Sequence, residues 1–211
     1  MSNSENKRQI ILDAANQLFQ LQGFDKTTIL DIAREAGSSK ATIYELFESK
    51  ERLFVECIST AAELYIKNSL AAFSAPSSAA GMTLRDFSQG FLNIACSAQS
   101  VAMQRLIISE ASRSEVGTLF FAKVNRLLGY VADFLAALMA TGFLRPDDPN
   151  LAAKHLRALL EAELIEPLLL HVKEGAPDEK DVIRAVGRAV AVFIRAYAPA
   201  NRSSEQRSPA K

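Results

Sequence analysis

Apolar residues recur at intervals of three and four over most of this chain, and that spacing is the strongest constraint on its fold. This spacing places an apolar stripe along one side of a helix. The strict alternation of apolar and polar residues that marks a half-buried strand is scarce. Nine glycines and seven prolines in 211 residues stand mostly between the periodic stretches, where they end helices. Hydrophobic residues form 49% of the chain, enough for a sizeable core. The sequence therefore predicts an all-α protein.

Capping and breaking residues divide this pattern into separate helices. Before residue 74, the predicted helices cover residues 5–21, a short stretch between Thr28 and Gly37, and residues 40–47 and 50–73. We expect a loop over 74–81, because SAPSSAAG is small and turn-prone. The later helices are predicted over residues 83–97, 100–112, 114–140, 150–171 and 178–197. Pro167 lacks an amide hydrogen and should bend its helix near Glu163.

Charge and composition exclude several classes of protein. Lys plus Arg and Asp plus Glu both number 24, so the chain cannot coat nucleic acid by bulk charge, and any such contact must be local. Cys57 and Cys96 lie far apart without a nearby histidine, which fits buried thiols in a reducing cytoplasm rather than a disulfide or zinc site. His155 and His171 lack the spacing of a helical metal pair. We expect no metal, no cofactor, no membrane span and no signal peptide.

Residues 27–54 carry the most specific pattern in the chain. Two short capped helices meet at Gly37 and a long helix follows, which is the arrangement of a helix-turn-helix motif. At about 100° per residue, the helix over 40–47 has one packing face, made by Ile43, Leu46 and Phe47. The opposite face and its flanks are formed by Lys40, Ala41, Thr42, Tyr44 and Glu45.

The outward residues suit contacts with a DNA duplex. Small Ala41 lets the backbone approach base edges, and Glu45 can accept a hydrogen bond from a cytosine amino group. Hydroxyl groups and lysines suit phosphate oxygens, helped by the helix dipole at Thr28 and Ser39. The candidate DNA-binding residues are Lys7, Thr28, Ser39, Lys40, Ala41, Thr42, Tyr44, Glu45 and Lys50. The alternatives are helix caps for Thr28 and Ser39, a core edge for Tyr44, and ordinary solvated charges for Lys40, Glu45 and Lys50.

The run TTILDIAREAGSSKATIYELFESKERLF resembles the DNA-binding signature of the TetR family of transcriptional regulators. Its Asp-Ile-Ala, Ala-Gly, Ser-Lys and Thr-Ile-Tyr groups carry the likeness, which extends over residues 7–55 with the preceding helix. RLIISEASR and LRPDDPNLAAKHL resemble the regulatory domain of AefR-like members. The resemblance implies a three-helix DNA-binding domain over 1–50 and a helical regulatory and dimerisation domain over 51–198. Residues 199–211 lack large apolar side chains and are expected to form a disordered tail.

Three features depart from the family pattern. Ala41 stands where glycine is common, and Glu45 and Leu46 stand where aromatic residues or histidine are frequent. Leu46 cannot make a polar contact with phosphate. The first 55 residues hold seven Lys and Arg against eight Asp and Glu, so binding must depend on where charges lie rather than on their sum.

The second domain offers candidates for a ligand cavity and a dimer interface. The cavity candidates are Phe91, Met103, Ile107, Phe121, Val124 and the acid Glu163, although such apolar sets also form ordinary cores and such acids are often exposed. The last helix is apolar on two sides and needs two neighbours. One neighbour is expected to be a second subunit, with an interface of Leu159, Leu160, Leu164, Ala185, Ala189, Val192 and Ala196. The alternative is the core of one monomer.

These features together predict a cytoplasmic, ligand-responsive regulator, most simply a repressor. As the resemblance implies, a homodimer would bind a palindromic double-stranded operator and leave it when a small, largely apolar inducer binds. The alternative is a ligand-independent dimeric DNA-binding protein whose second domain only dimerises. An enzyme or carrier is disfavoured, because no nucleophile with a base, glycine-rich phosphate loop or metal spacing is present in the sequence.

Overall fold

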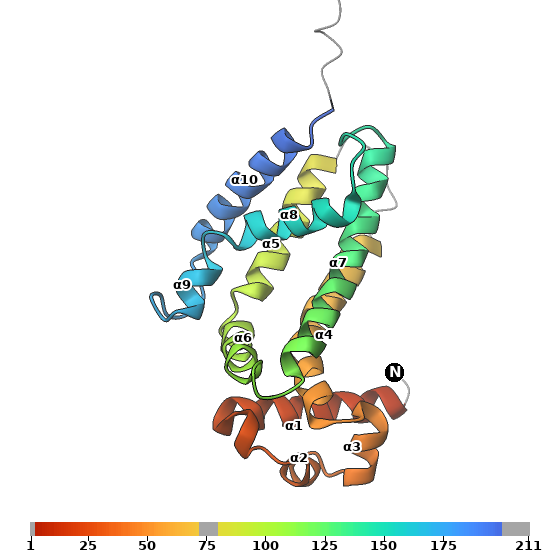
Figure 1. Cartoon of the computed structure of the whole chain (residues 1–211), viewed down its shortest axis with the longest axis vertical. Coiled ribbons are helices and arrows are strands. Elements are labelled where there is room, and N and C mark those ends of the chain that lie inside the picture. The colour runs from red at the N-terminus through yellow and green to blue at the C-terminus, as the bar shows by residue number, and fades with distance from the viewer. Residues whose placement is uncertain (1–2, 72–79, 200–211) are drawn as a thin grey trace, which may run out of the picture.

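The computed structural model describes residues 3–71 and 80–199, and every regular element within them is a helix (Figure 1). The helices are α1 (Asn3–Lys26), α2 (Ile29–Glu35), α3 (Lys40–Phe47), α4 (Lys50–Ala71), α5 (Ala80–Ala95), α6 (Ala98–Glu110), α7 (Val116–Ala140), α8 (Pro149–Glu161), α9 (Ile165–Leu169) and α10 (Glu179–Ala196). The all-α fold is therefore confirmed. The predicted tail lies outside the described residues from residue 200 onward.

Helix boundaries follow the local signals closely, with three differences. The range of α1 extends to Lys26, but the helix breaks at Gly23, whose φ of 83° is not helical, so the predicted end near residue 21 coincides with a kink. The predicted loop over 74–81 falls mostly outside the described residues, and its last two residues already belong to α5. The predicted helix over 150–171 is two helices, because the chain turns at residues 162–164 and Pro167 lies in the first turn of α9, where a missing amide is tolerated.

Two hydrophobic clusters form the core, and they share α4. The first joins α1, α2 and α3 to the start of α4, and three phenylalanines at its centre are in ring contact: Phe19, Phe24 and Phe54. It also takes in Met103 and Ile107 of α6. The second cluster is built from α4, α5, α7, α8, α9 and α10.

α4 and α7 run side by side between the two clusters (Figure 1). α4 begins within the helix-turn-helix unit and continues into the second cluster, and α7 begins with Val116 in the first cluster and continues in the same way. Both helices therefore contribute side chains to the cluster that holds the α1–α3 unit. Within the described residues, no helix is both long enough and apolar enough to cross a bilayer.

Candidate DNA-binding surface and regulatory cavity

A side-chain cap begins α2, and a glycine turn connects α2 to α3. The Thr28 hydroxyl donates to Asp31 Oδ2 at 2.6 Å and accepts the Asp31 amide at 3.2 Å, which is a reciprocal cap at the start of α2. The hydrogen bond from Thr28 lowers the pKa of Asp31. After α2, Gly37 adopts a φ of 57°, the left-handed conformation that glycine permits without a side-chain clash. The cap thus sets the start of α2, and the turn at Gly37 sets how α3 leaves α2.

α3 has the two faces that the sequence predicts. Ile43 and Phe47 are buried against the first core cluster. On the other side, Lys40, Ala41 and Glu45 are exposed. Tyr44 is also outward, with 51% of its surface exposed. The helix therefore presents small, hydroxyl-bearing and charged side chains together on one free surface.

Ser39 caps α3 at the same surface. Its Oγ accepts the Thr42 amide at 3.1 Å and lies 2.9 Å from Thr42 Oγ1. Thr28 and Ser39 are both exposed at helix starts, where unpaired amides favour a phosphate. Lys7 is exposed on α1. All nine predicted DNA-binding residues are therefore exposed or half-buried, although the charge of one of them, Lys50, points inward.

Lys50 is the exception and needs correction. Its ammonium donates to the carbonyl oxygens of Phe24 at 3.0 Å and Thr27 at 3.2 Å. It also lies 4.1 Å from the centroid of the Phe24 ring. These inward contacts use the charge to hold the α1–α2 connection against α4, so Lys50 is a structural residue rather than an outward phosphate contact.

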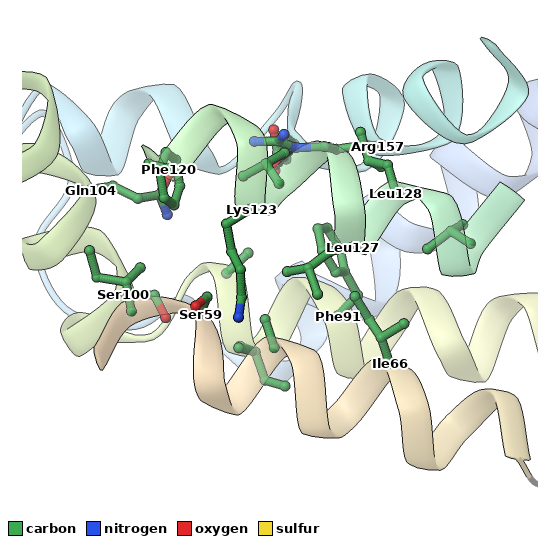
Figure 2. A pocket seen from close by; sticks show the side chains of 17 residues that line it. Ser59, Ile66, Phe91, Ser100, Gln104, Phe120, Lys123, Leu127, Leu128 and Arg157 are labelled. Carbon is green, nitrogen blue, oxygen red and sulfur yellow. Dashed lines mark hydrogen bonds and ion pairs between the residues drawn. The ribbon is translucent and has the colours of Figure 1, made fainter. Parts of the chain in front are cut away.

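A cavity of about 100 Å³ lies in the second domain between α4, α5, α6, α7 and α8 (Figure 2). Its wall is largely apolar and includes Phe91, Phe120, Val124, Leu127 and Val131. The polar groups on the wall are Ser59, Ser100, Gln104, Lys123, Arg157 and Glu161. An apolar enclosure with a few polar groups is the usual form of a small-molecule site.

Of the predicted cavity residues, only Phe91 and Val124 line this cavity. Met103 and Ile107 are buried in the first core cluster, because α6 packs onto α1; Met103 borders a separate hollow beside Cys57. Phe121 is 68% exposed, since the cavity-facing stripe of α7 passes through its neighbour Phe120. Glu163 is exposed and accepts from Arg188 Nε at 2.8 Å, and that hydrogen bond lowers its pKa.

The charged groups at the cavity were missed from the sequence. Lys123 is buried on α7, where its ammonium lies 3.0 Å from Glu56 Oε1 and 2.6 Å from Glu63 Oε2. Although burial raises the pKa of Glu63, hydrogen bonds from Lys123 and Lys67 bring it down to about 2. One signal of a buried charge is available in the sequence: Lys123 lies within the apolar stripe that Phe120, Val124 and Leu127 form on α7.

The predicted dimer residues divide into two groups. Leu160, Leu164, Ala185 and Ala189 are buried in the core of the chain itself, because α10 packs against α5 and α8; they complete one subunit and are not free to contact another. Leu159 is half-buried, and Val192 and Ala196 are exposed. Further exposed apolar residues are Leu151 and Ala158 on α8, Ala162 directly after α8, and Ile183 on α10.

No cluster of three or more metal-binding side chains occurs in the described part of the chain. Cys57 and Cys96 are free thiols, and burial raises the pKa of both. A raised thiol pKa disfavours the thiolate that nucleophilic or metal chemistry requires.

Comparisons with known proteins match both the helix-turn-helix unit and the helices that follow it. Residues 11–57 match the family of bacterial regulatory proteins described as tetR, and residues 82–199 match the C-terminal domain of AefR-like transcriptional repressors. The uncharacterised HTH-type transcriptional regulator YxaF of Bacillus subtilis is 26% identical over 181 residues, 84% of this chain and 92% of that protein.

Solved structures give the same result. A TetR-family regulator from Mesorhizobium loti superposes with a TM-score of 0.77 at 26% identity, over 94% of this chain and all of that one. The flavonoid-responsive regulator FrrA superposes with a TM-score of 0.67 at 30% identity, over 93% of this chain and 100% of its own.

Proposed function

Because the chain belongs to the TetR family of bacterial transcriptional regulators, which are not enzymes, we propose that it is a cytoplasmic, ligand-responsive repressor. A homodimer binds a palindromic operator through α3 of each subunit, and a small molecule in the second domain releases it. The observation that carries the proposal is the exposed face of α3, where Ala41, Tyr44 and Glu45 stand clear of the protein's own core.

That face suits the major groove of a duplex. Ala41 lets the helix approach closely, Glu45 is placed to read a base edge, and the hydroxyl of Tyr44 suits a phosphate. In a two-fold dimer, the two α3 helices must enter successive major grooves about 34–36 Å apart. The operator is therefore expected to be an inverted repeat.

The second domain supports a ligand of largely apolar character. FrrA, at 30% identity, is described as responding to flavonoids, which favours an aromatic or otherwise apolar compound here. The cavity of about 100 Å³ is smaller than the roughly 300–1,000 Å³ of ordinary ligand sites. A ligand must therefore widen it by moving the helices around it, and binding then favours the widened conformation.

The exposed apolar residues of α8 and α10 support the dimer. Leu151, Ile183 and Val192 are large side chains left uncovered on helices whose other faces are buried. A second copy related by a two-fold axis would cover them with the same surface, as in a four-helix interface.

Selection from a random duplex library tests the proposal. Fragments retained by the purified protein at physiological salt should share an inverted repeat, bound at least about a thousandfold more tightly than random duplex. Retained fragments without a common sequence would contradict it.

The small cavity also favours a second candidate, a dimeric DNA-binding protein without a ligand. Thermal unfolding in the presence of an apolar compound library separates the two, because any ligand of the native state raises its melting temperature. Stabilisation by one class of compound supports the repressor, and no stabilisation across the library supports the second candidate.

A further inference from the structure

Lys123 stands between the cavity and the DNA-binding unit. Its side chain lines the cavity and also a groove formed with Arg8, Phe47 and Glu56. Figure 2 shows it extending from α7 toward α4, beside Ser59. The side chain is 7% exposed, and a lysine is this buried only when its charge is paired. The groups that pair with the Lys123 ammonium therefore affect which charged ligands the cavity can bind.

Two carboxylates hold the Lys123 ammonium, and they are held unequally by the rest of the protein. Glu63 is also bound by Lys67 at 2.7 Å and by Arg126 at 3.4 Å. Glu56 has one further cation, Arg8, whose guanidinium lies 3.0 Å from Glu56 Oε2. Glu56 therefore contacts two cations, whereas Glu63 contacts three.

Arg8 connects Glu56 to α3. Arg8 lies in α1, and its Cζ is 4.9 Å from the centroid of the Phe47 ring. Phe47 is the last residue of α3 and is buried. Cation–π contacts of this kind contribute to how helices are held together. Lys123, Glu56, Arg8 and Phe47 thus form one chain of contacts from the cavity to α3.

The cavity wall presents a cation. Arg157 and Glu161 compensate each other, since Arg157 Nε donates to Glu161 Oε1 at 2.8 Å. Glu56 and Glu63 lie behind Lys123 and are not part of the wall. An ammonium has three N–H donors, and two of them meet these glutamates. These two contacts leave one donor of Lys123, a residue of the cavity wall, for an acceptor group of a ligand.

Building on the proposed function, we propose that the cavity takes an amphipathic carboxylic acid whose carboxylate binds Lys123 and displaces Glu56. Three carboxylates around one ammonium repel one another, so the least firmly held moves away. Glu56 then draws Arg8 away from the Phe47 ring, and the contact of Arg8 with Phe47 is lost. The α1–α3 unit is released from its position on α4 and α7, which lowers the affinity for the operator.

Calorimetry with octanoate and octan-1-ol tests the ligand class, because the two differ only in the acid group. We expect the full-length wild-type protein to bind octanoate at least tenfold more tightly than octan-1-ol. Lys123→Met should remove that preference. The proposal is overturned if the wild type binds octan-1-ol as tightly as octanoate or more tightly. It is also overturned if the wild type binds neither compound at millimolar concentration.

A matched pair of variants tests the relay. Glu56→Gln and Glu63→Gln each remove one carboxylate from Lys123, but only Glu56 is attached to Arg8. With the duplex that the wild type selects, saturating octanoate should weaken DNA binding at least tenfold in the wild type and in Glu63→Gln. In Glu56→Gln the change should be within twofold, although octanoate still binds.

An equal response of the two variants to octanoate would overturn the relay. The absence of any duplex preference in protein without octanoate would overturn the proposed function and the relay together. The calorimetric comparison still decides the ligand class in that case, so the two failures are distinguishable.

Discussion

At the scale of single residues, side chains of the same type have different roles because their surroundings differ. Lys40 is exposed at the start of α3, Lys50 binds two carbonyl oxygens, and Lys123 is buried between two carboxylates. Sequence spacing predicted which side of α3 each residue occupies, because that depends only on helical geometry. It could not predict the inward turn of Lys50, whose partners Phe24 and Thr27 approach it only when the helices pack.

The two outward residues of α3 should differ in what they contribute to DNA binding. Tyr44→Phe should weaken binding to all duplexes by a similar factor if its hydroxyl meets a phosphate. Glu45→Ala should relax the preference at one base pair, by about 1–3 kcal/mol of discrimination. Affinities for a set of single-base operator variants measure both effects. A uniform loss for both substitutions would show that Glu45 reads no base.

Lys50 and Lys40 form a matched pair that separates structure from binding. Lys50→Met should lower the free energy of unfolding by about 1.5–3 kcal/mol, because two buried carbonyls lose a charged donor. Lys40→Met should change it by less than about 0.5 kcal/mol, but should weaken DNA binding and reduce its salt dependence by about one counterion. Urea unfolding and binding at several salt concentrations give both quantities. Equal stability of the two variants would contradict the structural role of Lys50.

At the scale of helices, the contact between α4 and α7 combines apolar packing with ion pairs. Local signals predicted each of these helices, but not the pairing of Lys123 with Glu56, which lies 67 positions away. The prediction of Phe121 as a cavity residue is wrong by one position, since Phe120 lines the cavity instead. One position rotates a side chain by about 100° around the helix. A face of a helix can be predicted from its period, whereas the neighbour of that face cannot.

The α4–α7 contact should weaken at low pH. The pKa of Glu63 falls from its ordinary 4.5 to about 2 in the folded protein, so its carboxylate stabilises the fold above pH 4.5. That contribution is lost as the pH falls through about 2. The wild type should therefore lose about 1–3 kcal/mol more than Glu63→Gln between pH 5 and pH 2. Urea unfolding across this range at fixed protein concentration measures the difference, and parallel curves would contradict it.

At the scale of the whole molecule, the two core clusters meet along α4 and α7 (Figure 1). This arrangement makes the cavity and the DNA-binding unit parts of one packed body. The family signature in residues 27–54 gave the unit's architecture from the sequence. Four of the seven residues predicted for a dimer interface, Leu160, Leu164, Ala185 and Ala189, are buried in the core of the chain itself.

The exposed apolar residues of α10 should control assembly. Val192→Asp places a charge on the proposed two-fold interface, so the protein should sediment as a monomer and bind the palindromic duplex at least about a hundredfold more weakly, a loss of about 2.7 kcal/mol. Phe121→Asp is the control, because Phe121 is also exposed but belongs to α7 rather than to α8 or α10. Sedimentation velocity of the two variants distinguishes them. Dimeric Val192→Asp, or monomeric Phe121→Asp, would place the interface elsewhere.

A hydroxyl-radical footprint on the selected duplex tests most directly whether the free face of α3 reads DNA in both subunits. The account predicts two protected patches centred about one helical turn apart, both lost when Ala41→Glu puts a bulky charge on that face. A single patch, or the same footprint with Ala41→Glu, would contradict it.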